Sequence, residues 1–195
     1  PHSHPLLSGI TTEAPAYNIS PWLVPDWPGI VALARQAAVD VPPGNSILLF
    51  GLDQLLHGCP FPTATEMDDL FGDRIAVIIA LSQHKAAVTT AALEPLDWLD
   101  NAPPDPVGGT FGRRPDGSLD GTADEVPAVL AFAAPALQSL GGHSLAQASS
   151  YLAGMSRAGI TAASELAYDT TMASAYEALW SLPHVPMRMS VYHST

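Results

Sequence analysis

The chain has 195 residues, which is enough for one sizeable hydrophobic core and marginal for two domains. Its composition, with 47% hydrophobic and 13% charged residues, is that of a folded globular protein and excludes a disordered one. The formal net charge of −12, from 19 acidic and 7 basic residues, repels phosphate backbones and argues against nucleic acid as a partner.

Cysteine content and apolar run length bear on where the protein resides. The single cysteine, Cys59, excludes an internal disulfide and fits a reducing compartment, so we expect a cytoplasmic protein. The longest apolar run, residues 75–81, is far shorter than the roughly 20 residues that cross a bilayer. We therefore expect no membrane partner.

In chain order, the first half alternates predicted helices with predicted buried strands. The segment DWPGIVALARQAAVD predicts a helix over 26–40, because Asp26 can cap it and Pro28 suits a first turn. The apolar runs SILLFGL (46–52) and RIAVIIALS (74–82) are bounded by turn formers and predict buried strands. The other elements expected here are an extended loop over 5–25, a capping-box helix over 63–71 and a helix within 84–99.

The second half changes to longer helices that alternate with strands. Pro and Gly in RRPDGSL (113–119) are placed for a tight reversal of the chain. Helices are predicted over 125–140, 144–158 and 170–182, and strands over 159–166 and 187–193. Strands that alternate with helices of this length favour parallel βα units.

The chain opens with PHSHP, in which His2 and His4 lie one residue apart. Residues two apart on a strand point to the same face, and neutral imidazole is the commonest metal ligand in proteins. The pair is a candidate metal site, although zinc requires three or four ligands and two histidines also occur in solvated tails.

Five segments, in order, resemble the amidohydrolase superfamily, and within it the YtcJ-like branch called amidohydrolase family 3. PHSHPLLSGI is similar to its first metal-binding strand, although the aspartate that usually precedes the histidines would fall before Pro1. The other matching segments are the stretch FGLDQLLHGCPFPTATEMDDLFGDRIAVIIALSQHKAAVTTAALE, the hairpin PDPVGGTFGRRPDGSLDGTADE, and the strands AGITAASEL and VPMRMSVY.

The resemblance implies an α/β fold that is a partial TIM (β/α)₈ barrel of the metal-dependent hydrolase type with an inserted α+β subdomain. The end of the first barrel strand, with the following loop and helix, is expected in 1–40, the inserted subdomain in 41–125, and the second and third barrel βα units in 126–195. A closed barrel takes roughly 250 residues, so the resemblance also implies an internal fragment of a longer protein.

The function that the resemblance implies is hydrolysis of a C–N bond in an amide, formamide or cyclic amide by a metal-activated water. The cofactor is a divalent metal, expected to be zinc, with His2 and His4 among its ligands and the remaining ligands beyond residue 195. The partner is a small amide-like substrate, and a homodimer of the full-length protein is compatible with the resemblance. Two alternatives stay open, namely a related metal-dependent hydrolase acting on a C–O ester bond and a catalytically inactive binding module.

Three further residues are candidates for the site. The resemblance places His84 near the mouth of the active site and Glu125 at the acid that closes the hairpin, so both are expected to contact substrate. Glu165 ends the predicted strand over 159–166, where barrel enzymes carry their chemistry, and is a candidate catalytic residue. His84 as a helix cap or a buried hydrogen-bonded histidine is the competing interpretation. We interpret His57 and Cys59 as a loop histidine and a small buried thiol.

Overall fold

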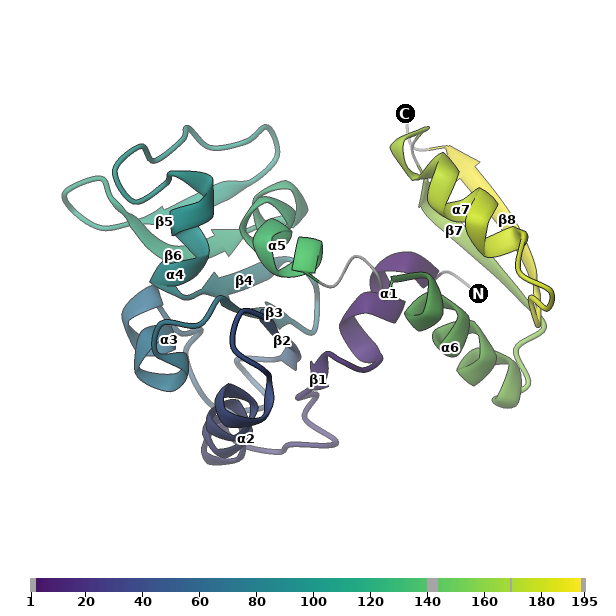
Figure 1. Ribbon diagram of the computed structural model, residues 1–195, viewed down its shortest axis with the longest axis horizontal. Helices are drawn as coiled ribbons and strands as arrows, with labels where there is room; N and C mark the ends of the chain where they lie inside the picture. The colour runs from purple at the N-terminus through teal and green to yellow at the C-terminus, as the bar shows by residue number, and fades with distance from the viewer. Residues whose placement is uncertain (1–2, 140–143, 169, 194–195) are drawn as a thin grey trace. The chain divides into compact units, whose positions relative to one another are not determined.

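The computed structural model describes residues 3–139, 144–168 and 170–193. The chain divides into two compact units. The middle unit comprises Ala16–Ser139, and the terminal unit combines Pro1–Pro15 with Leu140–Thr195. Figure 1 shows the helices and strands of each unit.

The middle unit is a mixed α/β structure built on a six-stranded sheet. The strand order is β1-β2-β3-β4-β6-β5, in which β1, β2 and β3 run parallel and the remaining neighbours pair antiparallel. Its elements are β1 (Tyr17–Asn18), α2 (Trp27–Asp40), β2 (Ile47–Leu52), α3 (Ala64–Phe71), β3 (Ala76–Ala80), β4 (Lys85–Val88), α4 (Thr90–Leu93), η1 (Glu94–Leu96), β5 (Thr110–Arg113), β6 (Leu119–Asp124) and α5 (Val126–Ser139).

The central strands of this sheet are covered on both faces. Every residue of β2 and β3 is buried, as expected for a parallel strand pair between helical layers. Alternate residues such as Leu49 and Ile78 pack with α2 and α3, and α5 contacts β3, β4 and β6. The two predicted caps are confirmed, since Asp26 accepts a hydrogen bond from the Gly29 amide and Thr63 forms a capping box with Glu66.

The terminal unit is built from two segments that are distant in sequence. Its elements are α1 (Pro5–Thr12), α6 (Ser144–Arg157), β7 (Ala162–Tyr168), η2 (Thr170–Met172), α7 (Ala173–Trp180) and β8 (Arg188–His193). The prediction that its two strands are adjacent and parallel is confirmed, with Ala162 opposite Arg188. The Ser3 amide donates to the Ser164 carbonyl at 2.9 Å, so the segment before α1 runs beside β7. α1 packs on α6, and α7 lies against the β7–β8 pair (Figure 1).

Two sequence-based expectations are wrong, both where tertiary contacts decide the local structure. Residues 5–12, expected in an extended loop, form α1, because Pro5 suits a first helical turn and one face of the helix is buried. The start of the helix expected within 84–99 is strand β4, because these residues pair with β3 on one side and with β6 on the other. Only the short α4 and η1 follow it.

The boundaries of the units also differ from those expected for an inserted subdomain over 41–125. The middle unit begins before α2 and ends after α5. The reason is that α2 and α5 bury their apolar faces within this unit, so they belong to its core. Within the described part of the chain, no helix combines the length and the apolar character needed to cross a membrane.

His57 joins two loops of the middle unit. Its side chain is only 5% exposed. Its Nε2–H donates to the carbonyls of Ile19 and Val24 at 3.1 and 2.9 Å, and its Nδ1 accepts from the Asp53 amide at 3.0 Å. The Asp53 carbonyl also lies 2.9 Å from Nδ1. The interpretation of His57 as a loop histidine agrees with these four backbone contacts.

Replacing His57 by alanine is expected to destabilise the middle unit by about 2–3 kcal/mol, because two buried carbonyls lose their donor. The matched control is Leu56→Ala, at a side chain that is 62% exposed in the same turn, with an expected change within about 0.5 kcal/mol. Denaturant unfolding followed by tryptophan fluorescence measures both variants. Equal stability of the two variants would contradict the structural role of the imidazole.

Candidate functional site

A buried carboxylate marks the candidate site of the terminal unit. Glu165 lies on β7, and the pairing with β8 shifts register directly after it. Its side chain is only 3% exposed. A carboxylate in such a place requires hydrogen-bond partners, because burial of an unpaired charge is strongly unfavourable.

Each carboxylate oxygen of Glu165 has its own partner. The Nδ1 of His4 lies 2.6 Å from Oε1, and the hydroxyl of Tyr176 donates to Oε2 at 2.5 Å. Since a carboxylate accepts hydrogen bonds, this geometry assigns a proton to the Nδ1 of His4. Burial, and then the bond to the Glu165 carboxylate, raise the pKa of Tyr176 far above its ordinary value, so the phenol remains a donor.

The geometry of His4 fits a metal ligand. A histidine that binds a metal through one ring nitrogen generally donates the other N–H to a carboxylate, a carbonyl or a water, and His4 has this arrangement with Glu165. His2, the other predicted ligand, lies outside the described residues. Among residues 3–139, 144–168 and 170–193, no group of three or more His, Cys, Asp or Glu side chains could hold a metal ion.

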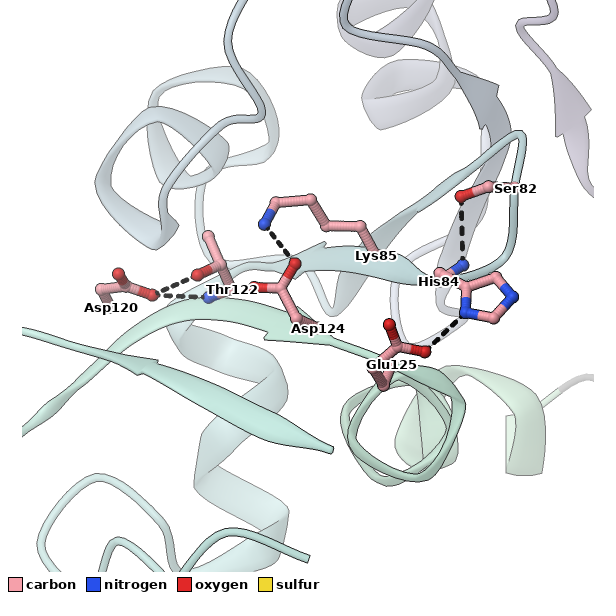
Figure 2. Close-up of polar contacts among 7 residues, drawn as sticks. All are labelled: Ser82, His84, Lys85, Asp120, Thr122, Asp124 and Glu125. Atoms are coloured by element: carbon pink, nitrogen blue, oxygen red, sulfur yellow. Dashed lines mark hydrogen bonds and ion pairs between the residues drawn. The ribbon is translucent and has the colours of Figure 1, made fainter. Parts of the chain in front are cut away.

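The predicted substrate contacts His84 and Glu125 lie together in the middle unit. The Nδ1 of His84 is 2.6 Å from Oε2 of Glu125, and both side chains are exposed. His84 directly precedes β4 and Glu125 directly follows β6 (Figure 2). The competing interpretation of His84 as a buried histidine is therefore wrong, because its ring is on the surface and pairs with an acid 41 positions away in the sequence.

A second ion pair lies next to the first. Lys85 and Asp124 are opposite one another on β4 and β6, and the Lys85 Nζ is 2.6 Å from Asp124 Oδ1 (Figure 2). Both pairs line a cavity of about 340 Å³ that also contacts Leu52, Asp53 and Phe61. A cavity of this size, with hydrogen-bonding groups and an apolar wall, is suited to a small polar molecule.

The backbone at this corner adopts an unfavourable conformation. Glu125 has φ 70°, in the left-handed region that non-glycine residues avoid at a cost of about 1–2 kcal/mol. Its amide donates to the His84 carbonyl at 2.8 Å, and its carbonyl accepts from the first turn of α5. These bonds hold Glu125 where β6 turns into α5, with its carboxylate beside the His84 ring.

Three members of these clusters, Tyr176, Lys85 and Asp124, are not among the residues that the sequence predicts for the site. In the sequence, Tyr176 is one of several residues of the helix predicted over 170–182, and Asp124 belongs to the predicted hairpin. For Tyr176 no local signal exists, because the phenol is explained only by the buried carboxylate on β7. For Asp124, the strand register that pairs it with Lys85 could have indicated the contact.

No protein-family model and no curated protein matches the chain. It is similar to two solved structures, described as those of uncharacterized metal-dependent hydrolases. The structure from Pyrococcus horikoshii OT3 has 15% sequence identity and a TM-score of 0.62, and the match covers 98% of this chain and 35% of that one. The structure from Pyrococcus furiosus has 16% identity and a TM-score of 0.59, with coverage of 98% and 36%. The chain therefore has the fold of these hydrolases over almost all its length, and spans about a third of theirs.

Proposed function

We propose that the chain is part of a metal-dependent hydrolase of the amidohydrolase superfamily, in its YtcJ-like branch. The observation that carries the proposal is the bond from His4 Nδ1 to the buried carboxylate of Glu165, beside a pair of parallel strands. The similarity of the fold to two proteins described as metal-dependent hydrolases supports it. In this proposal, β7 and β8 are consecutive strands of a (β/α)₈ barrel, and the Ser3 segment beside β7 belongs to the strand before them.

The proposed roles follow from the positions of the side chains. His2 and His4 hold a divalent metal, which we propose to be zinc, since imidazole is a common zinc ligand. When bound, the metal supplies an activated water for attack on the carbonyl of an amide, formamide or cyclic amide. Glu165, the candidate catalytic residue of the sequence analysis, is buried and contacts the proposed metal ligand His4. His84 and Glu125 are exposed at a cavity of the middle unit and are proposed to contact a small polar substrate.

We expect the double variant His2→Ala/His4→Ala of the complete protein to lose its bound metal and its hydrolase activity together. Elemental analysis of the purified protein measures the metal, and paired amide and ester substrates measure which bond is cleaved. The matched control is His184→Ala, which removes an exposed histidine of the terminal unit and should leave both unchanged. Full metal content in the double variant would refute the assignment of these ligands. Ester cleavage alone would favour the C–O alternative, and metal-free protein without either activity would favour a binding module.

A further inference from the structure

We propose that Glu165 is a positioning residue for His4, and that Tyr176 in turn holds the Glu165 carboxylate in place. The three side chains form a chain of hydrogen bonds that keeps the His4 proton on Nδ1 and leaves Nε2 as the metal-binding nitrogen. The inference rests on the proposed function, because it describes how the terminal unit prepares a ligand for a metal. It assigns Glu165 a role through His4 rather than through contact with substrate.

The two oxygens of Glu165 have separate partners. Oε1 faces the His4 ring at 2.6 Å, and Oε2 faces the Tyr176 hydroxyl at 2.5 Å. A hydrogen bond to an ionised carboxylate is stronger than one between two neutral groups. A carboxylate that is 3% exposed and bonded at both oxygens is suited to orienting a neighbour.

Each member of the chain of hydrogen bonds is supported by a different element. Glu165 lies on β7, opposite Val191 of β8. Tyr176 is fully buried on α7, with its ring centroid 5.8 Å from that of Tyr168 and 5.4 Å from that of Trp180. His4 is the N-cap residue of α1, which packs on α6. Packing around the buried ring of Tyr176 limits its movement, and through the hydrogen bond to Oε2 it also limits that of the carboxylate.

This arrangement has a consequence for metal binding. A neutral imidazole has one N–H and one lone pair, and a strong acceptor beside Nδ1 fixes the lone pair at Nε2. Partners of this kind also increase the basicity of the ligand, and their loss typically lowers metal affinity by roughly 10–100-fold. A buried glutamate with a merely structural role would affect stability without selecting a tautomer of His4.

The test is the tautomer of His4 in the metal-free protein, measured by long-range ¹H–¹⁵N NMR and assigned with a His4→Ala variant. We expect the wild-type ring to carry its proton on Nδ1. Glu165→Gln replaces a charged acceptor with a neutral one of the same shape, so the share of rings protonated on Nε2 should increase. Tyr176→Phe removes the hydroxyl that holds Oε2 and should change the tautomer in the same direction by a smaller amount.

Two control variants separate positioning from general damage. Glu177→Gln makes the same chemical change at an exposed site on α7, and Tyr192→Phe removes an exposed phenol from β8. Neither should alter the His4 tautomer. Thermal unfolding checks that every variant is folded. If Glu165→Gln does not fold, the wild type and Tyr176→Phe decide the question.

A titration with Zn²⁺ adds a second readout. We expect Glu165→Gln to bind the ion about 10-fold or more weakly than the wild type, and Tyr176→Phe several-fold more weakly. A wild-type His4 protonated on Nε2 overturns the inference, as does an unchanged tautomer in both folded variants. A further outcome separates this inference from the proposed function. If the wild-type ring carries its proton on Nδ1 but the complete protein binds no metal, the proposed function is refuted and the positioning of His4 is still supported.

Discussion

Replacing Gly121 by alanine is expected to destabilise the middle unit by about 2–5 kcal/mol. Gly121 lies on β6 with φ 86°, a conformation that costs alanine about 1–2 kcal/mol. A Cβ atom built there would lie 2.5 Å from the Cβ of Ala64 and 2.9 Å from its backbone nitrogen. Ala64 is the first residue of α3, so β6 and α3 must separate, and overpacking of this kind typically costs another 1–3 kcal/mol.

The matched control for this prediction is Gly117→Ala. Gly117 has nearly the same backbone conformation, with φ 88°, but no atom of the described residues lies within 4 Å of a Cβ built there. This variant should lose only the conformational contribution of about 1–2 kcal/mol. Amide hydrogen exchange of the central strands measures the free energy of unfolding of the middle unit for both proteins. If the two variants lose equal stability, close contact between β6 and α3 does not restrict position 121.

Replacing Gly9 by alanine is expected to weaken the packing of α1 on α6 in the terminal unit. In an isolated helix this change would be favourable by about 0.5–1 kcal/mol, because glycine has a large conformational entropy in the unfolded chain. Here a Cβ would lie 2.6 Å from the Ala148 nitrogen and 2.8 Å from the Gln147 carbonyl carbon. Backbone atoms cannot rotate away, so the helices must separate and the expected net loss is about 1–3 kcal/mol.

Gly154→Ala is the control, and we expect it to increase the free energy of unfolding instead of lowering it. Gly154 lies within α6, and outside the helix backbone a Cβ there would approach one atom of the described residues, at the guanidinium end of the Arg157 side chain, at 3.6 Å. The variant should therefore be more stable than the wild type by about 0.5–1 kcal/mol. Amide exchange of α6 measures both changes. Since His4 is the N-cap residue of α1, Gly9→Ala should also disturb the His4–Glu165 bond, which the tautomer of His4 would report. A gain of stability in Gly9→Ala would show that α1 does not pack as described.

Local patterns were sufficient for the elements with a strong signal of their own. The apolar runs that became β2 and β3 are bounded by turn formers, and their burial follows from composition alone. Asp26 and the Thr63–Glu66 pair start their helices through contacts within three residues, so spacing in the sequence was enough. The parallel pairing of β7 and β8 also followed from the alternation of strand and helix.

Local patterns could not predict the elements that are stabilised by contacts with residues distant in the sequence. α1 is short and rich in turn formers, and it is helical because α6 buries one of its faces. β4 has the composition of a helix, with two alanines in four residues, and it is a strand because β3 and β6 supply hydrogen bonds on both sides. Propensity is a weak prior, and tertiary context overrides it in both cases.

The candidate sites also depend partly on the sequence and partly on the tertiary structure. The sequence by itself determined the residue types, namely an H-x-H pair, a glutamate on a predicted strand, and a histidine and an acid near a hairpin. The tertiary structure decided which of them meet. His4 and Glu165 are 161 positions apart, and their 2.6 Å contact exists because the segment before α1 runs beside β7. Tyr176 contacts Glu165 because α7 packs on the same strands. The contact depends on packing between two elements, so the spacing of the residues in the sequence does not reveal it.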